Sequence, residues 1–244
     1  MAHARIDFIV VGAQKAGTTA LHDFLSEDPA YAVSGIKEVH FFDDETMNWD
    51  APDYAPYHAH FDWRPGAIRG EATPIYLYWP RSLERISVYN PVIKLIVMLR
   101  DPVERAWSHW RMETVRGVET RPFSWCIREG RTRLFKAAPW GVHREFSYVE
   151  RGFYGEQMAR LLDLFPREQV LVLKAEDLRT APSAALTRVA AFLGNHHVRR
   201  VEPREVHVGR DVGTRLAAGD VAFLREIYAD DAARLMDLTG ILFE

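Results

Sequence analysis

The chain has 244 residues, of which 48% are hydrophobic and 27% charged, and its formal net charge at pH 7 is −3. This length and composition allow one sizeable core and exclude a disordered, collagenous or coiled-coil protein. Because the net charge is slightly negative, no global basic field attracts nucleic acid or an anionic membrane, so any anion site is local. The single cysteine, Cys126, excludes a disulfide framework and a cysteine-based metal cluster.

Apolar strand patterns alternate with helical patterns along the chain. This alternation is typical of an α/β protein with a central parallel sheet and helices on both faces. In chain order we expect strands at 6–11, 93–99 and 169–174, and helices at 18–25, 102–115, 155–165, 182–193 and 216–238. Residues 44–67 have no sustained period and are predicted to be a surface excursion. No repeat or boundary divides the chain, so we expect a single domain over residues 1–244.

The sequence carries no pattern of a membrane helix or a signal peptide. The longest apolar stretch, residues 92–99, is interrupted by Lys94 and is much shorter than the roughly 20 residues that span a bilayer. The first apolar segment is short and is followed at once by Gly12. We therefore expect a cytoplasmic protein.

The most informative stretch is the loop between the first predicted strand and helix, which reads GAQKAGTT over residues 12–19. Backbone N–H groups in such a loop cradle phosphate oxygens, the helix N-terminus adds partial positive charge, and Lys15 adds a full charge. The pattern resembles a Walker A loop, but its lysine lies two positions before Gly17 instead of directly after it. A tight turn with a helix cap would explain the glycines and one threonine, but not Lys15 and the second threonine.

These residues resemble the 5′-phosphosulfate loop of sulfotransferases that use 3′-phosphoadenosine 5′-phosphosulfate (PAPS). Further segments are similar to that family in order and spacing, at 37–43, 70–76, 94–108 and 151–170. The likeness is closest to the heparan-sulfate O- and N-sulfotransferases, and we expect a bacterial member. For the cofactor, it implies a binding loop made of Lys15, Ala16, Gly17, Thr18 and Thr19.

The segment 94–108 is similar to the family's 3′-phosphate motif. Arg100 follows a predicted central strand at the sheet edge where α/β proteins bind ligands, and its forked guanidinium suits a phosphate. The resemblance adds Ser108 as a second 3′-phosphate ligand, although a helical serine by itself usually only faces solvent. Asp101 could be read as a Walker B aspartate, but its place before Pro102 favours a helix cap.

The reaction also needs a base to take the acceptor's proton. If residues 37–42 are extended, Glu38 and His40 share one face of the segment, so both are candidates. The resemblance favours Glu38, whereas histidine has the more convenient ordinary pKa. The alternative without catalysis is an ion pair between Lys37 and Glu38, with His40 as a polar group of the core.

The implied reaction is in-line transfer of a sulfuryl group from PAPS to a hydroxyl, in preference to an amine, leaving adenosine 3′,5′-bisphosphate (PAP). Lys15 is expected to stabilise the departing phosphate. No carboxylate cluster of metal-ligand type is found, so no metal is predicted. Two other functions stay open: a P-loop kinase acting on small molecules, and a non-catalytic nucleotide-binding subunit. A requirement for Mg²⁺ and ATP would distinguish the kinase.

The sequence departs from the heparan-sulfate enzymes at several points. Ala72 stands where they commonly carry a lysine, the chain has one cysteine where they tend to have a pair, and we expect no Golgi anchor. Gly209 and Arg210 are the counterparts of a final cofactor loop, but the lysine of that loop is absent. These losses favour a small hydroxylated acceptor or a glycolipid over a long polyanionic glycan.

Overall fold

The computed structural model describes residues 5–136, 144–195, 201–204 and 213–243. The chain divides into two compact units, each built from two segments. Unit 1 comprises Met1–Leu99 and Leu161–His207, and unit 2 comprises Arg100–Arg160 and Val208–Glu244. The single-domain interpretation therefore stays a prediction, and each unit is described by itself.

Unit 1 contains a five-stranded sheet in the order β2-β3-β1-β4-β5, in which every neighbouring pair is parallel. Its strands are β1 (Phe8–Gly12), β2 (Tyr31–Val33), β3 (Ile68–Ala72), β4 (Lys94–Leu99) and β5 (Val170–Lys174). All five residues of β1 are buried, as are the last five of β4, because helices cover both faces of these strands. Val10 of β1 pairs with Ala72 of β3, so these two strands end side by side.

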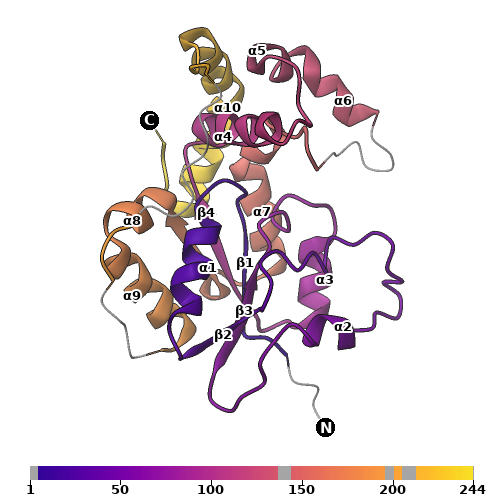
Figure 1. The fold of residues 1–244 in the computed structure, drawn as a ribbon, viewed down its shortest axis with the longest axis vertical. Helices are drawn as coiled ribbons and strands as arrows, with labels where there is room; N and C mark the ends of the chain where they lie inside the picture. The colour runs from indigo at the N-terminus through magenta and orange to yellow at the C-terminus, as the bar shows by residue number, and fades with distance from the viewer. Residues whose placement is uncertain (1–4, 137–143, 196–200, 205–212, 244) are drawn as a thin grey trace. The chain divides into compact units, whose positions relative to one another are not determined.

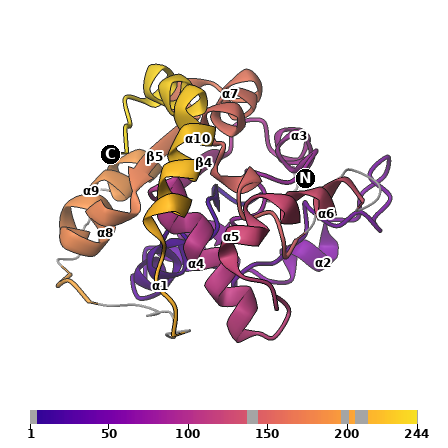
Figure 2. The ribbon, with the colours of Figure 1, turned by 90° about the horizontal axis from the view of Figure 1, so that it is seen from above.

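The helices of unit 1 pack around this sheet. They are α1 (Thr18–Ser26), α2 (Ala55–His58), α3 (Ser82–Tyr89), α8 (Ala175–Thr180) and α9 (Pro182–Leu193). Figures 1 and 2 show α1 and α3 on opposite faces of the sheet. This confirms the predicted α/β class. Helix α9 begins at Pro182 and ends before Gly194, whose φ of 83° is the left-handed conformation that closes many helices.

Unit 2 consists of helices. They are α4 (Pro102–Val115), α5 (Phe123–Cys126), α6 (Thr132–Phe135), the greater part of α7 (Tyr154–Leu164) and α10 (Ala218–Thr239). Short 3-10 turns lie at Glu129–Arg131 and Glu150–Gly152, and a third in unit 1 at Arg167–Gln169. The predicted cap of α4 is confirmed, because the Asp101 carboxylate accepts the N–H of Glu104 at 2.9 Å.

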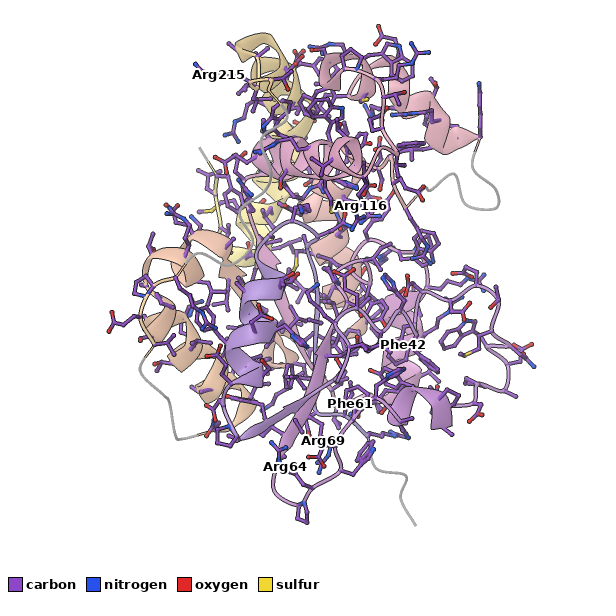
Figure 3. All side chains as sticks on the ribbon, in the orientation of Figure 1. Phe42, Phe61, Arg64, Arg69, Arg116 and Arg215 are labelled. Atoms are coloured by element: carbon purple, nitrogen blue, oxygen red, sulfur yellow. The ribbon has the colours of Figure 1, made fainter. Side chains whose placement is uncertain are left out.

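Two parts of the sequence-based description need correction. Strands β2 and β3 and helix α3 were not predicted, because β2 has only three residues and β3 carries Arg69, Gly70 and Glu71 in its centre. Residues 44–67 are more than a surface excursion. Tyr57 is fully buried in α2 and Phe61 (Figure 3) is 6% exposed, so the segment contributes to the core of unit 1.

Within the described residues, none of the helices combines the length and the apolar character needed to cross a membrane. The predicted cytoplasmic location stays a prediction.

Candidate active site

The predicted anion loop connects β1 to α1 at the carboxyl edge of the sheet. Its start is anchored to β4, since Ala13 N–H donates to Met98 C=O at 2.7 Å. Within the loop, Ala16 N–H donates to Ala13 C=O at 3.1 Å. Gly17 is the N-cap residue of α1, with φ at 83°, and no side chain caps this helix. The N–H groups of the first turn are therefore not used by a capping side chain.

Among the described residues other than glycine, a positive φ occurs at Lys15 (70°), Glu38 (63°), His40 (56°) and Arg81 (64°). The first three are predicted site residues. Such conformations cost free energy and persist where the surrounding structure holds them, which is common at functional sites. Their concentration at Lys15, Glu38 and His40 singles out these residues independently of motif matching.

Residues 37–42 do not form the extended segment that the sequence analysis assumed. Left-handed backbone at Glu38 and His40 interrupts an extended conformation, so simple alternation of faces does not apply to this segment. The two side chains nevertheless meet, since His40 Nε2 lies 3.5 Å from Glu38 Oε2. His40 Nδ1 lies 2.9 Å from Asp43 Oδ2.

These contacts decide the charge of both candidate bases. Burial opposes ionisation of Glu38, but its contacts with His40 and Lys37 outweigh burial and lower its pKa to about 2. The hydrogen bonds of His40 to Asp43 and Glu38 raise the pKa of the imidazole to about 9. At neutral pH Glu38 is therefore a carboxylate and His40 an imidazolium.

The alternative without catalysis is half correct. Lys37 and Glu38 do form an ion pair. His40, however, is not a core residue, because its side chain is 44% exposed. Its exposed imidazolium links two carboxylates, one of which is fully buried, and such an arrangement can hold a carboxylate in a fixed position beside a substrate.

The Glu38 loop follows β2 and contacts the end of β3, the strand that lies between β2 and β1. The N–H of Glu38 donates to the C=O of Ala72, the last residue of β3, at 3.1 Å. Because β3 and β1 are parallel neighbours, both loops leave the sheet at the same edge. This is the edge at which open α/β sheets bind ligands.

The buried carboxyl group of Glu71 lies near the Glu38 loop, and no role was assigned to it from the sequence. Glu71 of β3 is 1% exposed, and burial raises its pKa to about 7. Tyr57 and Thr73 donate hydrogen bonds to its two oxygens, at 2.8 and 2.5 Å. No local signal in the sequence marks Glu71, because an arginine and a glycine precede it in the same strand. Asp43 was likewise quoted within a motif but given no role.

The predicted 3′-phosphate ligands belong to unit 2. Arg100 follows β4 directly in the chain, as predicted, and its guanidinium bonds Glu104 at 2.9 and 3.0 Å. Ser108 lies two turns further along α4 and is half-buried. Gly209 and Arg210 lie outside the described residues. Among the described residues, no group of three or more His, Cys, Asp or Glu side chains is placed so that it could hold a metal ion.

Comparison with known proteins finds sulfotransferases among both sequence relatives and solved structures. A sequence model of the sulfotransferase domain matches residues 5–204. Human heparan sulfate glucosamine 3-O-sulfotransferase 3B1 is 32% identical over 189 residues, covering 76% of this chain and 45% of that protein. The bifunctional heparan sulfate N-deacetylase/N-sulfotransferase 2 of Bos taurus is 26% identical over 202 residues, covering 77% of this chain and 22% of that protein.

A solved structure is similar over nearly the whole chain. The crystal structure of a sulfotransferase from Alicyclobacillus acidocaldarius has a TM-score of 0.82 and 29% sequence identity, and the similarity covers 98% of both chains. The chain spans less than half the length of the two curated relatives named above.

Proposed function

Because the chain belongs to the sulfotransferase family, we propose that it transfers a sulfuryl group from PAPS to a hydroxyl group of a small-molecule or glycan acceptor. The observation that carries this proposal is the placement of two loops at the same edge of the sheet. One is an anion loop with a lysine, and the other presents an ionised carboxylate. A nucleotide donor and a proton acceptor are what this reaction requires.

The donor's phosphosulfate end is assigned to the loop of Lys15, Ala16, Gly17, Thr18 and Thr19. Two of these residues, Lys15 and Gly17, have left-handed backbone, which helps to arrange successive N–H groups around an anion. PAPS supplies a sulfuryl group whose transfer leaves negative charge on a phosphate. Lys15 is assigned to neutralise that charge, and the first turn of α1 adds its partial positive charge.

Glu38 is assigned as the base that accepts the acceptor's proton. It is ionised at neutral pH, whereas His40 already carries its proton and has no lone pair to offer. His40 is assigned to hold Glu38 in place through the 3.5 Å contact. Entry of an acceptor removes water from Glu38, which raises the pKa of its carboxyl and makes it a stronger base.

Arg100 and Ser108 are assigned to the 3′-phosphate. Arg100 is 38% exposed and bonds Glu104, also exposed, which lies one helical turn away. Exposed pairs of this kind contribute only about 0.3–0.5 kcal/mol, so a phosphate can compete for the guanidinium. Gly209 and Arg210 remain proposed cofactor contacts on resemblance alone.

The acceptor is proposed to be a small hydroxylated molecule or glycolipid and not a long polyanionic glycan. Ala72 offers no positive charge at the end of β3. The segment that follows the base, residues 43–53, contains five acidic residues and no basic one. A polyanion would be repelled from this segment.

Two experiments test the proposed function. Calorimetric titration with PAP, with and without a chelator, is expected to show equally tight binding in both conditions. Binding that requires Mg²⁺ would instead favour the kinase. A panel of radiolabelled transfers from PAPS to heparan sulfate, simple sugars, phenols and glycolipids identifies the acceptor. Sulfation restricted to heparan sulfate would overturn the acceptor class.

A further inference from the structure

The side-chain hydroxyl of Tyr76 holds the backbone of the Glu38 loop. Tyr76 Oη accepts the N–H of Phe41 at 2.9 Å and the N–H of Phe42 at 3.3 Å. These two residues occupy the positions between His40 and Asp43. Both residues are buried, so without the hydroxyl their N–H groups would need another hydrogen-bond acceptor. A buried N–H without an acceptor would destabilise the folded protein.

The hydroxyl of Tyr76 is oriented by Glu71. It lies 3.3 Å from Glu71 Oε1, to which Tyr57 also donates a hydrogen bond at 2.8 Å. Since Tyr76 Oη accepts hydrogen bonds from two N–H groups, its own O–H can donate a hydrogen bond to Glu71. Tyr76 and Glu71 are both at most 1% exposed, so water does not compete for this hydrogen bond.

Helix α3 holds the carbonyl side of Phe42. Ser82 Oγ and Arg85 Nη1 donate to the C=O of Phe42 at 3.1 and 2.9 Å. Figure 3 shows Phe42 beside this helix. With its N–H bonded to Tyr76 and its C=O to α3, the Phe42 residue is fixed at both backbone groups.

The loop needs this support because its backbone is strained. Glu38 and His40 both have a positive φ, a conformation that persists only where neighbouring contacts hold it. The hydrogen bond from the N–H of Glu38 to the C=O of Ala72 holds the start of the loop. Tyr76 holds its second half.

We infer that Tyr76, oriented by Glu71, is a positioning residue that fixes the peptide groups between His40 and Asp43 and thereby holds Glu38 for deprotonation of the acceptor. The inference rests on the proposed role of Glu38. Tyr76 acts only through the backbone of this loop.

Tyr76→Phe tests the inference, since it removes only the hydroxyl. We expect amide hydrogen exchange at Phe41 and Phe42 to become at least about tenfold faster, since a lost hydrogen bond of about 1.4 kcal/mol changes an opening equilibrium tenfold. We also expect the pKa of His40, measured by NMR, to fall from about 9 towards its ordinary 6.5. Unchanged exchange at Phe41 and Phe42, or an unchanged His40 pKa, would overturn the inference.

Tyr89→Phe is the matched control. Tyr89 is 3% exposed and belongs to the same aromatic cluster, with its ring centroid 5.5 Å from that of Phe42. Its hydroxyl, however, accepts the N–H of Ile6 at 3.1 Å. This variant should speed exchange at Ile6 and leave Phe41, Phe42 and the His40 pKa as they are. An equal effect of both variants on His40 would indicate a general loss of packing and would contradict the inference.

Glu71→Met provides a second variant in case Tyr76→Phe does not fold. It keeps the side-chain volume but removes the acceptor that orients Tyr76, so the same changes at Phe41, Phe42 and His40 are expected. Glu71→Gln retains an acceptor oxygen, so this variant should behave like the wild type at Phe41, Phe42 and His40. Absence of these changes in Glu71→Met would overturn the role of Glu71.

Turnover separates this inference from the proposed function. With an acceptor found by the transfer panel, Tyr76→Phe should lower kcat about tenfold to hundredfold, as displaced catalytic groups do, with the KM for PAPS within twofold. Full activity of Glu38→Gln would overturn the proposed base. If Glu38→Gln is inactive while Tyr76→Phe turns over like Tyr89→Phe, only the positioning role fails.

Discussion

The imidazole of His40 lies 2.9 Å from the carboxylate of Asp43, and this contact determines which group near the site can act as a base. Asp43 is fully buried, so its interaction with the imidazolium is only weakly screened by water. Together with Glu38, Asp43 keeps His40 protonated to about pH 9. Of the two candidate bases, Glu38 is therefore the one with a lone pair that can accept a proton.

Asp43→Asn is expected to lower the pKa of His40, because the hydrogen bond to the Asp43 carboxylate is the largest cause of its elevation. NMR titration of the imidazole measures this. His22 on α1 serves as an internal reference. Its pKa is lowered by burial and by Lys37, and Asp43 is not among the causes of this shift, so His22 should titrate at the same pH in both proteins. A His40 pKa that stays near 9 in the variant would contradict the assignment.

Lys15→Ala is expected to reduce kcat about 10²- to 10³-fold, the usual effect of removing one positioned donor at a developing negative charge. PAP binding, measured by calorimetry, should weaken much less, because the backbone of the loop remains. Lys15→Arg should recover part of the rate. A variant whose kcat is unchanged while PAP affinity collapses would make Lys15 a binding residue only.

Gly17→Ala is expected to cost about 1–2 kcal/mol of stability, since a side chain at this left-handed position is strained. Gly194→Ala is a matched control, because both glycines have φ at 83° and a methyl group at either would not clash with a neighbour. Urea denaturation should show similar losses for the two variants. Only Gly17→Ala should weaken PAP binding, and equal PAP affinities would contradict the placement of the phosphosulfate.

Glu71→Gln is expected to change how stability depends on pH. The raised pKa of about 7 means that the folded protein keeps a proton on Glu71 that the unfolded chain releases above about 4.5. This contribution is fully present below pH 4.5 and is lost as pH rises to about 7. The stability difference between wild type and variant should therefore fall by on the order of 3 kcal/mol across this range and stay constant above it.

Urea denaturation of both proteins at several pH values between 4 and 8 provides this measurement. The contributions of other titrating groups cancel in the difference. A difference that is constant across the range, or that grows with pH, would contradict a neutral Glu71 in the folded protein.

Arg100→Ala is expected to weaken PAP binding about tenfold to hundredfold, as loss of a charged hydrogen bond does. Glu104→Gln, which releases the guanidinium of Arg100, should strengthen binding about twofold. Arg116→Ala is the control, because Arg116 is also an exposed arginine of unit 2, next to the other end of α4 (Figure 3), where it bonds Glu113. Equal affinities of the Arg100 and Arg116 variants would remove Arg100 from the phosphate site.

The sequence by itself determined the elements whose signals are local. The apolar runs of β1 and β4, the capping pair before α4 and the limits of α9 each depend on neighbouring residues, and the structure confirms them. The loop of Lys15 and Gly17 was identified in the same way, since its glycines, lysine and threonines are contiguous. The resemblance to sulfotransferases also rested on contiguous segments, and the family comparison confirms it.

Only the tertiary structure decided how the Glu38 loop is arranged. An extended segment was the premise of the sequence-based interpretation, but Tyr76, more than thirty residues away, holds Phe41 and Phe42 in a loop that no local period encodes. The charge states of Glu38 and His40 follow from that arrangement, because a pKa depends on which groups lie within a few ångströms and on burial. Both are set by contacts between distant parts of the chain, which periodicity cannot report.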